Sequence, residues 1–142
     1  MSRMIFVNLP VEDLGRSRAF YEAVGLVNNP RFSDETAACM VWSDTIYAML
    51  VTHPKWATFT TRPIAAAGSS EVALCLTCDS RDDVHAILAA GGQAGGTVDI
   101  NPPEEHGMMM TRSLGDPDGH VWEFTWMDPT FAPGTSSADT LA

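Results

Sequence analysis

The chain has 142 residues, the length of one domain, and a formal net charge of −10 from 18 acidic and 8 basic side chains. This acidity argues against nucleic acid and anionic membrane surfaces as partners, because both carry phosphate charge. Three cysteines without a disulfide or zinc spacing favour buried thiols in a reducing cytoplasm, and no apolar run is long enough to cross a membrane.

The first half of the chain is predicted to form a strand, a helix and three further extended segments. Alternate side chains of a strand face opposite sides, so Phe6 and Asn8 share one face of the first strand. Asp13 is a candidate N-cap for the helix, and Gly25 ends it. The five elements are expected over residues 5–11, 14–24, 27–32, 37–42 and 45–53.

The second half repeats this order. A constant offset of 66 residues aligns Asp79 with Asp13 and Gly91 with Gly25, so a second helix is expected within residues 79–92. The last two strands are joined by a turn with the sequence GDPDG. Strands are expected over residues 71–78, 95–100, 108–114 and 120–127. Two copies of a βαβββ unit indicate a duplicated half-domain inside one sheet.

The predicted organisation is a single α+β domain over residues 1–128. Its two modules cover about residues 3–52 and 70–128, and an irregular connector rich in Pro, Thr and Ala covers residues 53–69. A tail rich in Pro, Gly and Ser follows over residues 129–142.

Two motifs give this plan a family resemblance. An early V-x-D-L-x-x-S-x-x-F-Y, from Val11 to Tyr21, and a late D-P-D-G-x-x-x-E, from Asp116 to Glu123, lie at the right separation on the duplicated pattern. The sequence thus resembles the vicinal oxygen chelate superfamily, which contains glyoxalases, bleomycin-resistance proteins and extradiol dioxygenases. The resemblance implies a cupped eight-stranded mixed sheet built from two modules, often completed by a homodimer. It does not specify an activity, because one fold can serve unrelated functions.

The resemblance also implies where a divalent metal ion would bind in the cup. Glu123 matches the ligand position on the last strand, but Phe6 occupies the first-strand position usually held by His or Gln. Val72 or Ala73 occupies the matching position of the second module, and the first module has Tyr47 or Met49 where a carboxylate is expected. One carboxylate cannot by itself hold a catalytic ion.

Other side chains are candidates for the same cup. Arg112 shares a strand face with Met110, and we expect either Glu123 or an anionic ligand as its partner. His106 is a candidate acid/base group at the rim, or else a solvated loop residue. The predicted catalytic group is Glu123, Arg112 and His106, with Glu123 also the metal candidate. The predicted ligand-binding side chains are Phe6, Asn8, Tyr47, Met49, Met110 and Arg112.

Two functions remain open from the sequence. The first is a cytoplasmic glyoxalase- or bleomycin-resistance-like protein with a degenerate metal site and no metal cofactor, which binds a small hydrophobic or cationic molecule in the cavity. The second is a divalent-metal-dependent lyase, isomerase or dioxygenase, similar to lactoylglutathione lyase, that uses Glu123 with unconventional partners such as Glu71 or His106.

Overall fold

The first module forms a four-stranded sheet. In the computed structural model, which describes residues 2–131, its strand order is β1-β4-β3-β2. β1 runs parallel to β4, and the other pairs are antiparallel. The elements are β1 (Ile5–Val11), α1 (Leu14–Ala23), β2 (Val27–Asn29), the 3-10 helix η1 (Pro30–Phe32), β3 (Ala37–Val41), β4 (Ile46–Thr52) and α2 (His53–Trp56).

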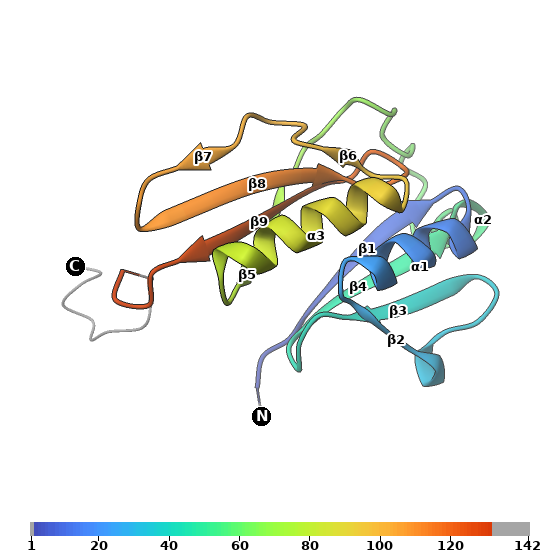
Figure 1. Ribbon diagram of the computed structural model, residues 1–142. Helices are drawn as coiled ribbons and strands as arrows, with labels where there is room; N and C mark the ends of the chain where they lie inside the picture. Colours follow the sequence, from blue (N-terminus) through green and yellow to red (C-terminus); the bar gives the residue numbers. More distant parts are fainter. Residues whose placement is uncertain (1, 132–142) are drawn as a thin grey trace.

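The second module repeats this topology in a five-stranded sheet. Its order is β5-β9-β8-β6, with β5 parallel to β9, and a short additional strand, β7, also pairs with β8. The elements are β5 (Leu74–Cys78), α3 (Arg81–Gln93), β6 (Thr97–Val98), β7 (Glu104–Glu105), β8 (Met109–Gly115) and β9 (Val121–Met127). The α+β class and the duplicated βαβββ plan are confirmed, and the strands form two hydrogen-bonded sheets in place of one continuous sheet (Figure 1).

The two long helices begin at side-chain caps. The Asp13 carboxylate accepts a hydrogen bond from the backbone N–H of Arg16, as predicted, whereas α3 is capped by the Ser80 hydroxyl, one residue after the predicted Asp79. α3 continues past Gly91, the residue that the 66-residue offset aligns with Gly25. A Cβ on Gly91 would clash with the Leu114 side chain, so this glycine permits close packing of the helix on β8 and does not end the helix.

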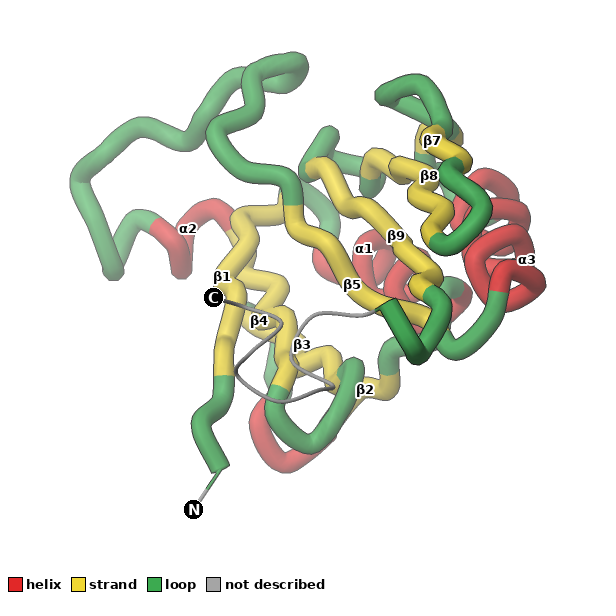
Figure 2. The backbone as a smooth tube through the Cα atoms, turned by 90° about the vertical axis from the view of Figure 1, so that its left-hand side faces the viewer, coloured by secondary structure: helices red, strands yellow, loops and turns green. Residues whose placement is uncertain are grey.

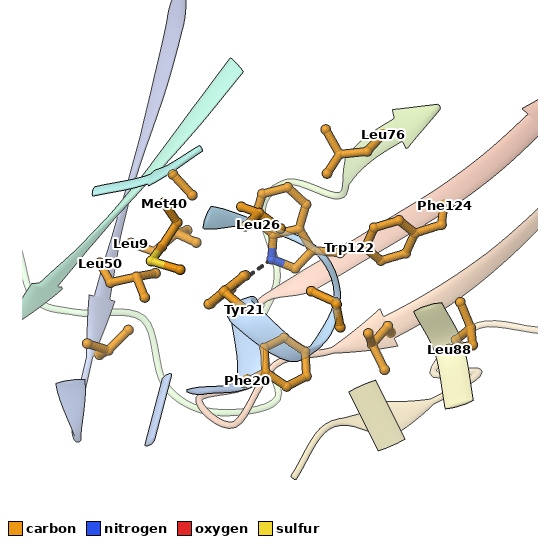
Figure 3. Packing of buried hydrophobic residues seen from close by; sticks show 14 of the residues in the cluster. Leu9, Phe20, Tyr21, Leu26, Met40, Leu50, Leu76, Leu88, Trp122 and Phe124 are labelled. Carbon is orange, nitrogen blue, oxygen red and sulfur yellow. Dashed lines mark hydrogen bonds between the residues drawn. The ribbon is translucent and has the colours of Figure 1, made fainter. Parts of the chain in front are cut away.

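The core lies between the two sheets and around α1. Figure 3 shows side chains of β1, β3 and β4 on one side of the helix and side chains of β5 and β9 on the other. Phe20 and Tyr21 project from α1, and Trp122 and Phe124 project from β9, as predicted for the helix-facing side of the last strand. All four are at most 3 % exposed, so burial of their large apolar surfaces is a main source of stability.

The early motif, Val11 to Tyr21, and the late motif, Asp116 to Glu123, contact each other in the structure. Asp118, in the turn before β9, accepts hydrogen bonds from the backbone N–H of Glu12 (2.9 Å) and from the Ser17 hydroxyl (3.1 Å). Nearby, the Tyr21 hydroxyl donates to Asp116 Oδ2 at 2.5 Å. The two motifs are therefore joined in the structure, because α1 of the first module is fixed on the turn of the second.

This contact has a buried centre. Tyr21 Oη also accepts a hydrogen bond from Trp122 Nε1 (2.9 Å), and Asp116 Oδ1 accepts from the backbone N–H groups of Asp118 and His120. Burial raises the pKa of Asp116 and, with the nearby Asp116 charge, raises the pKa of Tyr21 well above its usual range. The carboxylate is tolerated there because donors surround it.

Among residues 2–131, no helix combines the length and the apolar character needed to span a bilayer. The predicted C-terminal tail lies outside the described residues, apart from residues 129–131.

Candidate functional site

Each sheet has one face that packs on the helices and one that does not. We call the face that does not pack on the helices the open face. On the open face of the first sheet, strand register places Phe6 beside Tyr47 and Asn8 beside Met49, whereas Leu50 is buried on the other face. The Phe6 and Tyr47 rings are stacked, with centroids 4.5 Å apart and planes within 8°. The Phe6 side chain is 49 % exposed. The structure thus brings four predicted ligand-binding residues together on one open face.

The corresponding face of the second sheet is polar. Glu123 is half-buried on this face, with Cys75 beside it on β5 and Ser113 beside it on β8. A row of hydrogen bonds crosses the same face, because the Thr125 hydroxyl lies 3.1 Å from Cys75 Sγ and 2.8 Å from Thr111 Oγ1. The alternation that predicted Glu123 on the open face of β9 therefore agrees with its position.

A second carboxylate accompanies Glu123. Register pairs Glu104 with Thr111, which puts it on the open face, whereas Glu105 points the other way and forms an ion pair with Arg81. Both Glu104 and Glu123 line a cavity of about 410 Å³. Its lining residues are Asn101, Pro102, Pro103, Glu104, Thr111, Ser113 and Glu123.

Glu104 was missed from the sequence. Its local signal, an acidic pair after two prolines, is the same as that of an exposed loop. The pairing of β7 with β8 gives Glu104 and Glu105 opposite directions, and no two-residue strand can be recognised from periodicity.

His106 lies just beyond β7 and is exposed. Its backbone N–H donates to the carbonyl of Met109 (2.8 Å), which closes the turn into β8. The residue is not among those that line the cavity with Glu123. The structure therefore places it in a turn at the end of the second sheet, away from the lining of this cavity.

The predicted pairing of Arg112 with Glu123 is wrong. Arg112 is registered with Phe124, so it lies on the helix side of β8. There its guanidinium binds both carboxylate oxygens of Asp99, at 3.1 and 2.8 Å, and donates to His85 Nδ1. The bond to Asp99 raises the pKa of Arg112.

Met110 lies on the same helix-facing side and is 5 % exposed within the core. Neither Arg112 nor Met110 reaches the open face, and both are removed from the candidate site. The parity of β8 was predicted correctly, since both residues share a face with Leu114, but that face was assigned to the wrong side of the sheet.

The donor set does not fit a conventional divalent metal site. Within residues 2–131, no group of three or more His, Cys, Asp and Glu side chains is placed to hold an ion. The open faces offer two carboxylates and a thiol on the second sheet and an aromatic pair, an amide and a thioether on the first. Val72 and Ala73, the expected ligand positions of the second module, precede β5 and lack donor side chains. Stable divalent sites need more ligands with defined geometry.

Comparisons with known proteins agree with the duplicated βαβββ fold. Residues 3–43 match a family model described as bleomycin resistance protein-like N-terminal. A glyoxalase/bleomycin resistance protein/dioxygenase family enzyme from Burkholderia phytofirmans superposes with a TM-score of 0.71 at 18 % identity, over 89 % of this chain and 99 % of that one. The chain has the vicinal oxygen chelate fold.

Other solved structures share the fold. A glyoxalase-related enzyme from Fulvimarina pelagi has a TM-score of 0.72 at 19 % identity, covering 89 % of this chain and 88 % of that chain. A hypothetical protein from S. aureus has a TM-score of 0.74 at 21 % identity, covering 89 % and 94 %. No curated protein matches the chain. The fold that the resemblance implied is confirmed, and at these identities the solved structures specify the fold alone.

Proposed function

We propose that this vicinal oxygen chelate protein binds a small cationic molecule with an apolar part, and that Glu123 and Glu104 recognise the cation. The function is that of a binding protein with a degenerate metal site, in the manner suggested by the bleomycin-resistance family model that matches its N-terminal segment. The cavity beside Glu123 has a volume within the usual range for small-molecule sites.

The supporting observation is that the two carboxylates share a cavity and have no counterion among residues 2–131. Among residues 2–131, the ion pairs use the carboxylates of Glu22, Asp99, Glu105 and Asp118, and none involves Glu104 or Glu123. Arg112, the expected counterion, is held on the other side of the sheet. Two nearby negative charges repel each other, so a bound cation relieves this repulsion.

The rest of the cavity supports selection of an amphipathic cation. Pro102 and Pro103 provide an apolar wall. The Ser113 hydroxyl accepts from the backbone N–H of Asn101 and donates to its carbonyl, so the loop that forms the wall is fixed to β8. A preorganised wall lowers the entropy that ligand binding costs.

Calorimetric titration tests the proposal with a matched ligand pair. We expect 4-phenylbutylamine to bind and its neutral analogue, 4-phenylbutanol, to bind at least about tenfold more weakly, because a charged hydrogen bond is lost. Bleomycin, which is named in the description of the matching family model, is a third ligand for the same titration.

The variants Glu123→Gln and Glu104→Gln should each weaken amine binding by about tenfold. Glu35→Gln is the matched control, because it makes the same change in net charge at an exposed position in the β2–β3 connection. Equal affinity of the amine and the alcohol, or unchanged amine binding in both cavity variants, contradicts the proposal.

The metal-dependent alternative has its own test. Metal-stripped, untagged protein is titrated with nickel, zinc, manganese and iron(II), and ions bound per chain are counted. A tight stoichiometric site that disappears in Glu123→Gln would replace the binding proposal with an enzymatic one.

The homodimer and the cytoplasmic location stay predictions. Analytical ultracentrifugation of the untagged protein tests whether it is a homodimer.

A further inference from the structure

A second cavity lies beneath the connector between the two modules. Figure 2 shows this connector as a long loop that arches from α2 to β5. The cavity has a volume of about 480 Å³ and is separate from the one beside Glu123. It is enclosed by the connector on one side and by the ends of β1 and β9 with the 118–120 turn on the other.

The lining of this cavity is largely apolar. Trp56, Pro63 and Ile64 line it from α2 and the connector, and Val72 and Leu74 line it near the start of β5. Ile64 is 37 % exposed and Val72 is 60 % exposed, so the cavity walls include apolar surface in contact with solvent. A ligand with an apolar body would remove this surface from water, which is favourable.

An arginine, Arg62, also lines this cavity. Among residues 2–131, the ion pairs of arginine use Arg16, Arg18, Arg81 and Arg112, and Arg62 forms none. The backbone N–H of Arg62 is bonded to the Thr60 hydroxyl, which fixes the chain at this point. In a protein with 18 acidic side chains, an arginine left unpaired at a cavity is available for an anionic ligand.

The opposite wall is held in place by a histidine. His120 lines the cavity, and its Nε2 lies 2.8 Å from the Pro10 carbonyl oxygen. A carbonyl only accepts, so Nε2 carries the proton and the ring is tied to β1. The backbone N–H of the same residue donates to Asp116 Oδ1. The wall formed by Pro10 and His120 is therefore rigid, whereas the connector opposite supplies Arg62.

We propose that the cavity beneath the connector is a binding site for a small monocarboxylate with an apolar body, with Arg62 as the anchor for the carboxylate. The apolar walls receive the body of the ligand. Glu71 and Asp118 also line the cavity, and the Asp118 carboxylate is already bound by Arg16, the Ser17 hydroxyl and the backbone N–H of Glu12. The two carboxylates would repel a second negative charge, which limits the ligand to one carboxylate.

Tryptophan fluorescence and calorimetry test this site with 3-phenylpropionate as the probe. Trp56 lines the cavity, so saturating ligand should change its emission, and Trp56→Phe should remove this change. The neutral analogue, 3-phenylpropanamide, should bind at least about tenfold more weakly. Arg62→Gln should weaken binding of the carboxylate to a similar extent.

Arg31→Gln is the matched control, because Arg31 is an exposed residue of η1 and is not among the lining residues. It should bind the probe like the wild-type protein, and so should Glu123→Gln, which separates this site from the amine site proposed above. Equal binding of acid and amide, equal effects of the two arginine variants, or no saturable binding at about 1 mM probe would overturn the proposal.

Discussion

Replacing Tyr21 with phenylalanine removes a single oxygen from the buried contact between the two modules. The aromatic ring and its edge contacts with Phe20 and Trp122 remain, since their centroids lie 5.0 and 5.9 Å from that of Tyr21. Two hydrogen bonds are lost, one to Asp116 Oδ2 and one from Trp122 Nε1. The variant therefore isolates the polar part of the contact.

The expected loss of stability follows from the environment of these groups. Tyr21 is 1 % exposed, and Asp116 and Trp122 are each 3 % exposed, so water cannot replace the lost hydroxyl. A hydrogen bond to a charged group contributes about 1.5–3 kcal/mol, and a buried donor left without a partner costs about 1–3 kcal/mol. We expect Tyr21→Phe to lower the free energy of unfolding by about 3–5 kcal/mol, a large part of the total for a domain of this size.

Urea unfolding followed by tryptophan fluorescence measures this difference in the free energy of unfolding. If the free energy depends on urea concentration with the same slope in wild type and variant, the folded and unfolded states have the same compactness in both. Tyr47→Phe is the matched control, because the Tyr47 hydroxyl donates to the backbone carbonyl of Asp44 in an exposed contact. The control should change stability by less than about 1 kcal/mol. A Tyr21→Phe variant within that same range would refute the reasoning.

Three further predictions concern the same packing and the corrected site. Burial raises the pKa of Asp116 in the folded protein above its value in the unfolded chain, so protonation of Asp116 favours folding. This contribution to stability is lost as the pH rises through the folded pKa. In urea unfolding at a series of pH values, the stability of the wild type relative to Asp116→Asn should therefore fall from acid to neutral pH. Arg112→Gln should lower the free energy of unfolding by about 1 kcal/mol, yet calorimetry should show the same amine affinity as the wild type. Gly96→Ala should destabilise the folded protein by about 1–3 kcal/mol, because the new Cβ would lie 2.7 Å from the Gly115 carbonyl oxygen. Gly15→Ala, in the open first turn of α1, should stabilise it by about 0.5–1 kcal/mol. Thermal unfolding measures both differences.

Opposite outcomes would identify which step is wrong. A relative stability that rises with pH would mean that hydrogen bonds to Asp116 outweigh its burial. Loss of amine binding in Arg112→Gln would place Arg112 in the binding site. An unchanged or raised stability of Gly96→Ala would mean that the close approach of Gly96 to β8 does not limit the packing.

Local sequence patterns determined much of this protein. Period-two alternation placed Glu123 on the open face of β9 and Trp122 on the core face, because side-chain direction in a strand depends only on position. Asp13 marked the start of α1 for a similarly local reason, since a cap requires only the next few backbone N–H groups.

Contacts between distant segments were decided by the tertiary structure. Sequence could put Arg112 on a face with Leu114, but only the sheet's position against α3 decided that this face meets Asp99 and His85. Glu104 shares a cavity with Glu123 because β7 adds to β8, and the Leu114 side chain occupies the space that a Cβ at Gly91 of α3 would need. These outcomes depend on distances between residues far apart in the chain, which no local periodicity specifies.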